Sequence, residues 1–79
     1  MWSRYVKKKK FEVGVFNQAV RDAHSQGDRH KNLSDSWAET HYIEVEATSK
    51  IEAVKQLQLR YPASHGFRIV GAMEIPALE

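Results

Sequence analysis

The sequence predicts a two-layer α+β fold, in which a three-stranded, mainly antiparallel sheet in the order 2-1-3 carries one main helix on one face. Residues 40–75 form a complete strand–helix–strand unit with both helix ends marked, and a further strand precedes it. A right-handed crossover leaves the two strands of the unit parallel, with a gap that the earlier strand can fill antiparallel to both. The alternative, with the first strand at an edge and the later two paired in parallel, stays open.

The first strand is expected over residues 10–16. Phe11, Val13 and Val15 alternate with Glu12 and Gly14, which is the period of two of a strand with one buried face.

The next segment has two interpretations. A short helix beginning near Asn17 and ending at Gly27 fits the spacing of Phe16, Ala19, Val20 and Ala23. Continuation of the strand to Val20 fits nearly as well. Residues 24–39 are polar and turn-rich and predict a long loop, for which Trp37 and Leu33 are the expected anchors to the body.

The strand–helix–strand unit begins at residues 41–47, where Ile43, Val45 and Ala47 alternate with polar or amphipathic neighbours. Ser49 and Glu52 then form a capping box: the Ser49 hydroxyl accepts from the Glu52 amide, and the Glu52 carboxylate is expected to accept from the Ser49 amide.

The helix that follows carries one predicted apolar stripe, formed by Ile51, Ala53, Val54, Leu57 and Tyr61. Pro62 lacks an amide hydrogen and disfavours helical geometry before it, so the helix is expected to stop at Tyr61.

Gly66 turns the chain into the last strand. One face of that strand is predicted to hold Phe67, Ile69, Gly71, Met73 and Ile75.

Length and composition predict one domain over residues 10–76, with a basic tail at 1–9 and a short tail at 77–79 that could be the remnant of an expression tag. The 79 residues contain no cysteine, which excludes disulfides and thiolate chemistry and suits a reducing compartment, so cytoplasmic residence is expected. No apolar run is long enough to cross a bilayer, and no cofactor, small-molecule substrate or membrane partner is inferred.

Charge is unevenly distributed. Residues 1–10 hold five of the 12 basic groups and no acid, so the rest of the chain has a net charge of −3. Basic groups beside aromatic rings can neutralise phosphates and stack on unpaired bases. The candidate nucleic-acid contacts are Trp2, Arg4, Tyr5, Lys7, Lys8, Lys9 and Lys10, with Arg21, Arg29, Lys31 and Arg68 as possible additions from the body. A solubilising tail is the simpler interpretation of the same residues.

Catalytic and metal signatures are weak. The histidines, His24, His30, His41 and His65, match no metal-binding spacing. Asp35, Ser36 and His41 contain the ingredients of a hydrolytic triad, but no elbow glycines flank Ser36, and a local cap is the better interpretation. Glu44 and Glu46 are expected to keep an exposed sheet face soluble or to meet a basic partner.

The function these features favour is that of a non-catalytic accessory protein, a protein-interaction module with possible self-association. The candidate protein-binding residues are Trp37, Tyr42 and Asp35, with packing on the core as the first expectation for Trp37. Nucleic-acid binding through the basic tail is the alternative.

Overall fold

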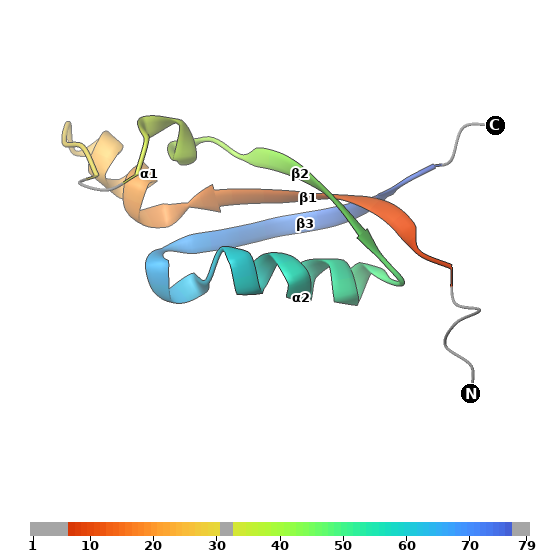
Figure 1. Ribbon diagram of the computed structural model, residues 1–79. Coiled ribbons are helices and arrows are strands. Elements are labelled where there is room, and N and C mark those ends of the chain that lie inside the picture. The colour runs from red at the N-terminus through yellow and green to blue at the C-terminus, as the bar shows by residue number, and fades with distance from the viewer. Residues whose placement is uncertain (1–6, 31–32, 77–79) are drawn as a thin grey trace.

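The computed structural model describes residues 7–30 and 33–76. Three strands, β1 (Lys9–Asn17), β2 (His41–Ala47) and β3 (Phe67–Ile75), form a sheet in the order β2-β1-β3. The main helix, α2 (Lys50–Arg60), runs along one face of this sheet, while a short helix, α1 (Gln18–Ser25), lies at one end (Figure 1). The predicted α+β class and the 2-1-3 order are confirmed.

Strand β1 is central and antiparallel to both neighbours. Phe11 lies opposite Val45, and Val13 lies opposite Ile43, so the apolar sets of β1 and β2 share the face that α2 covers. The alternative with β1 at an edge is therefore wrong.

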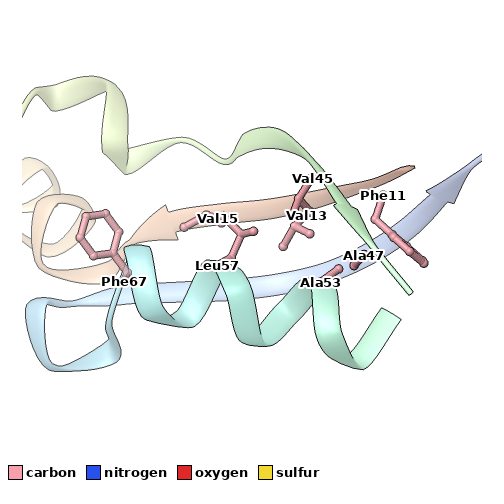
Figure 2. Packing of buried hydrophobic residues seen from close by; sticks show 8 residues of the cluster. All are labelled: Phe11, Val13, Val15, Val45, Ala47, Ala53, Leu57 and Phe67. Carbon is pink, nitrogen blue, oxygen red and sulfur yellow. The ribbon is translucent and has the colours of Figure 1, made fainter. Parts of the chain in front are cut away.

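The core lies between this face of the sheet and α2 (Figure 2). Val13, Val15, Ala47, Ala53 and Leu57 are fully buried there. Ala53 and Leu57 lie one helical turn apart, and the small Ala53 side chain allows α2 to approach the sheet closely.

The apolar stripe of α2 is narrower than the sequence pattern indicates. Ile51 is 71% exposed, although its spacing to Val54 and Leu57 placed it in the stripe. It lies about 160° around the helix from Ala53, because each residue advances about 100°. The helix docks through the Ala53–Leu57 line, so the inclusion of Ile51 was wrong.

Of the two capping-box hydrogen bonds predicted at the start of α2, one is present and the other has a different donor. Ser49 Oγ accepts from the Glu52 amide at 3.1 Å, as predicted. Glu52 Oε1, however, accepts from the Thr48 amide at 2.7 Å and not from the Ser49 amide. Ser49 has extended backbone geometry, and the carboxylate reaches one residue further back. The helix ends at Arg60 with Tyr61 as its C-cap, just before Pro62.

Asn17 ends β1 and begins α1, so the helical interpretation of this segment is confirmed. Its side chain is fully buried and makes two hydrogen bonds: Oδ1 accepts from the Val20 amide at 3.1 Å, and Nδ2 donates to the His65 carbonyl oxygen at 3.0 Å. Gly66, which follows His65 in the chain, has a φ of 93°, and a Cβ at this position would lie 2.8 Å from Asn17 Oδ1. One buried amide thus joins the start of α1 to the turn before β3.

Strand β3 contains a β-bulge that the sequence pattern does not predict. Gly14 pairs with Gly71, but the next residue of β1, Val15, pairs with Ile69, so Val70 is an extra residue. Such an insertion reverses the alternation of side chains beyond it. Phe67 and Ile69 face α2 as predicted, whereas Met73 lies on the other face and is 62% exposed. The single alternating face was therefore wrong beyond Val70.

The segment between α1 and β2 contains one turn of 3-10 helix, η2 (Asp35–Ala38). Its cap is Ser34, whose hydroxyl accepts from the Ser36 amide, and not Asp35 or Ser36. Leu33 and Trp37 both pack against the core cluster, so the two expected anchors are confirmed.

A candidate protein-binding face

The sheet has one face that α2 does not cover. We call it the open face and define it by Glu12, Gly14, Tyr42, Glu44, Glu46, Val70 and Met73. Three of its side chains are large, apolar or aromatic, and more than half exposed: Tyr42 at 66%, Val70 at 56% and Met73 at 62%. Exposed side chains of this kind, gathered on one rigid surface, are typical of a binding patch.

Gly14 forms the floor of this patch. It is buried in the central strand, and a Cβ at this position would lie 2.7 Å from Val70 Cγ2 and 3.2 Å from Tyr42 Cε1. The absence of a side chain thus lets Tyr42 and Val70 approach each other across β1. Together with Glu12 and Met73, these residues line a shallow hollow of about 250 Å³.

Carboxylates border the hollow on one side. Glu12 and Glu44 lie directly opposite each other in the β1–β2 register, and Glu46 lies two residues further along the same face of β2. Like charges in directly opposed positions repel each other. Within residues 7–30 and 33–76, none of the three carboxylates forms an ion pair. The border therefore favours a cationic ligand.

The lysine run lies at the end of the sheet where β1 begins. Lys7 to Lys10 are all exposed, and Lys9 and Lys10 belong to β1. Lys9 Nζ lies 3.9 Å from Glu74 Oε1, and Lys10 lies opposite Glu46 in the sheet register. The described lysines are thus close to acidic groups. Trp2, Arg4 and Tyr5, the other tail residues proposed to contact nucleic acid, lie outside the described residues.

The three candidate protein-binding residues do not form one patch. Trp37 stacks on His41 with ring centroids 4.0 Å apart, and on the α2 side of the sheet it lies tilted against Tyr61 and makes a T-shaped contact with Phe67. Tyr42 follows His41 in β2 and therefore points to the open face. Asp35 Oδ2 lies 4.0 Å from Arg29 Nε at the periphery. Trp37 thus packs on the body, and Tyr42 alone lies on the open face.

Ser36 and His41, two of the three residues considered for a hydrolytic triad, take part in a local turn. His41 Nε2 lies 3.0 Å from the carbonyl oxygen of Ser36, and the Ser36 hydroxyl lies 3.1 Å from Ser34 Oγ. Because a carbonyl oxygen only accepts, the contact requires the proton on Nε2, which then has no lone pair to activate the Ser36 hydroxyl. Among residues 7–30 and 33–76, no three His, Cys, Asp or Glu side chains are grouped to hold a metal ion.

The body arginines proposed as nucleic-acid contacts have local partners. The Arg21 guanidinium lies 3.6 Å from the Phe16 ring centroid, and its Nε donates to the Ala38 carbonyl oxygen at 2.9 Å. Arg68 Nη1 donates to the Phe67 carbonyl oxygen at 2.9 Å. Lys31 lies outside the described residues.

Comparison with protein-family models, curated proteins and solved structures finds no match to this chain. In the part of the chain that the structure describes, no helix is long and apolar enough to cross a membrane.

Sequence reasoning placed Tyr42, Glu44 and Glu46 on a wet strand face and left Val70 off the apolar face predicted for the last strand, but it missed Met73. Met73 joins that face only because of the bulge, which shifts it away from the core, whereas Val70 lies there by simple alternation next to the inward-facing Ile69. The available signal was Gly71 in the middle of a strand, since glycine inside a strand often marks a bulge.

Proposed function

We propose that this protein is a non-catalytic accessory protein that binds a partner protein on its open face. The observation that carries the proposal is an exposed apolar hollow, built around Gly14, Tyr42 and Val70, with a border of carboxylates that form no ion pair among the described residues. The hollow offers apolar contact area, and the carboxylates select for positive charge.

The partner inferred from this chemistry presents apolar side chains next to lysine or arginine. An apolar residue of the partner would enter the hollow between Tyr42 and Val70, and a basic residue would reach Glu12 and Glu44. The proposal keeps the cytoplasm as the compartment, as expected for this cysteine-free chain.

Nucleic-acid binding through the lysine run is the competing proposal. It is the weaker one because Lys9 lies beside Glu74 and Lys10 lies opposite Glu46, so phosphates would have to approach carboxylates.

The test is a titration of the full-length chain, followed by amide chemical shifts in NMR. One arm uses peptides in which lysine alternates with leucine or phenylalanine, and a matched arm uses the same peptides with glutamate in place of lysine. The expected result is saturable shifts at Glu12, Gly14 and Tyr42 with the lysine peptides alone. Shifts confined to other surfaces, or none at millimolar peptide, would overturn the proposal.

A third arm uses single-stranded oligonucleotides. Shifts at Lys7 to Lys10 would support the nucleic-acid alternative if affinity fell by roughly two to three orders of magnitude between 50 and 200 mM salt, as release of counterions from about five phosphates requires.

A further inference from the structure

Within residues 7–30 and 33–76, the outer edge of β3 carries backbone groups with no partner from the sheet. Strand β3 is nine residues long and, among the described strands, hydrogen-bonds to β1 on one side only. An edge of this kind is a template for another strand. The opposite edge differs, since Gln56 Nε2 of α2 donates to the Glu46 carbonyl oxygen of β2 at 2.9 Å.

The Gln56 bond fixes which backbone groups of the sheet point outward. The amide and carbonyl of one strand residue point to the same side, and successive residues alternate. Because the Glu46 carbonyl points away from β1, its register partner Lys10 directs its backbone groups toward β3. Glu12 and Gly14, two and four residues further along β1, also direct their backbone groups toward β3.

The same alternation assigns the residues of β3. Lys10 and Glu12 lie opposite Ile75 and Met73, whose backbone groups therefore bond to β1. Glu74 lies between these two residues, and Ala72 precedes Met73. Both therefore direct their amides and carbonyls to the free edge.

Contacts at the other end of β3 agree with this assignment. The Gln18 amide donates to the Gly66 carbonyl oxygen at 2.7 Å, which continues the β1–β3 ladder at steps of two from Gly14. The Phe67 carbonyl, one residue on, then points outward, where Arg68 Nη1 of its own chain donates to it at 2.9 Å. One carbonyl at the start of the edge is thus occupied, and among the described residues no hydrogen-bond partner reaches the edge beyond the bulge.

We propose that a second copy of this chain pairs antiparallel with this edge, about a two-fold axis at Met73. Ala72 of each copy then lies opposite Glu74 of the other, and each such pair exchanges two N–H···O=C hydrogen bonds. The result is a continuous six-stranded sheet. The proposal does not depend on the proposed function, because it rests on the backbone groups of the strand edge, although Met73 at the axis also lines the hollow.

The neighbouring registers are less favourable. An axis at Glu74 sets the two Glu74 side chains against each other and places Pro76, which has no amide hydrogen, opposite Ala72. An axis at Ala72 brings the bulge at Val70 into the new ladder. At Met73 each Glu74 meets an alanine, and its charge is balanced by Lys9 of its own chain at 3.9 Å.

This pairing also covers apolar side chains on both layers. On the open face, Met73 meets its own copy, and Ile75 lies over Gly71 of the second copy. On the helical layer, Val54 lines a groove with Ile69 and Gly71, and Ile51 lies one turn before it on the same flank of α2. Ile51 and Met73, at 71% and 62% exposed, therefore both flank the edge that the second copy would join.

The test is amide hydrogen exchange of the full-length chain at micromolar and millimolar concentration, with sedimentation equilibrium on the same samples. We expect the sedimenting mass to double and the protection of the Ala72 and Glu74 amides to rise on the order of tenfold, while Met73 and Ile75 stay protected throughout. A monomer at every concentration would overturn the proposal. Amide exchange rates at Ala72 and Glu74 that do not change with protein concentration would also overturn it.

A variant pair gives an independent readout. Met73→Lys sets two ammonium groups against each other at the axis and is expected to remain a monomer. Tyr42→Lys adds the same charge on the same face but on β2, and it should still dimerise. A dimer of Met73→Lys would contradict the register, and hydrogen exchange of the unmodified chain keeps the proposal testable if that variant does not fold.

Discussion

Asn17 is the buried polar residue on which the junction of β1, α1 and β3 depends. The sequence allows its role as an N-cap to be predicted, because asparagine is favoured at that position and Val20 follows three residues later. Its second bond, to the His65 carbonyl oxygen, spans 48 residues. No local pattern predicts that contact, since it arises only when the sheet brings the two turns together.

Replacing Asn17 should destabilise the fold. Asn17→Ala leaves the Val20 amide and the His65 carbonyl without a side-chain partner, and we expect it to lower the free energy of unfolding by about 1–3 kcal/mol. Asn17→Asp keeps the acceptor for Val20 but cannot donate to His65 when ionised, so it should also destabilise at neutral pH. Urea unfolding measures both, with the exposed Gln26→Ala as the control. An Asn17→Ala variant as stable as this control would refute the role.

The elements show where pattern reasoning succeeds and where it fails. The bounds of α2 were predictable because Ser49 and Pro62 act locally on the backbone. The face of β3 was not, because a bulge depends on how two strands share one register. Ile51 was misplaced for a related reason. The spacing of apolar residues defines a stripe along α2, but it does not determine which residues of that stripe contact the sheet.

The start of α2 predicts a pH dependence. The pKa of Glu52 is lowered from its ordinary value of 4.5, first because the Thr48 amide donates to the carboxylate, then through the Thr48 side chain, with a further contribution from the charge of Lys8. A lowered folded-state pKa means that the ionised form stabilises the fold above pH 4.5. That contribution disappears as pH falls through the folded-state pKa.

Comparison with Glu52→Gln isolates this effect. We expect the unmodified chain to be the more stable at neutral pH and the difference to shrink as pH falls below about 4.5. Thermal unfolding across this range measures it, and Glu39→Gln, an exposed carboxylate beyond η2, is the control. A difference that does not change with pH would show that the ionised carboxylate is not what stabilises the helix start.

At the scale of the whole molecule, one face of the sheet packs against α2 to form the core, and α2 leaves the other face uncovered. Local alternation was enough to predict that β2 has a wet side, but the hollow could not be predicted. It needs Gly14 of β1 between Tyr42 of β2 and Val70 of β3, three residues from segments far apart in the sequence. A second copy at the β3 edge would place two such open faces side by side.

The central claim is that the open face binds a basic, apolar partner, and one paired affinity measurement tests it most directly. Isothermal titration of the tightest lysine-containing peptide is compared between Tyr42→Ala on the open face and Leu59→Ala, which is 85% exposed on α2. The account predicts at least about a tenfold loss of affinity for Tyr42→Ala, as for a central aromatic contact, and none for Leu59→Ala. Equal affinities of the two variants, or a loss confined to Leu59→Ala, would contradict it.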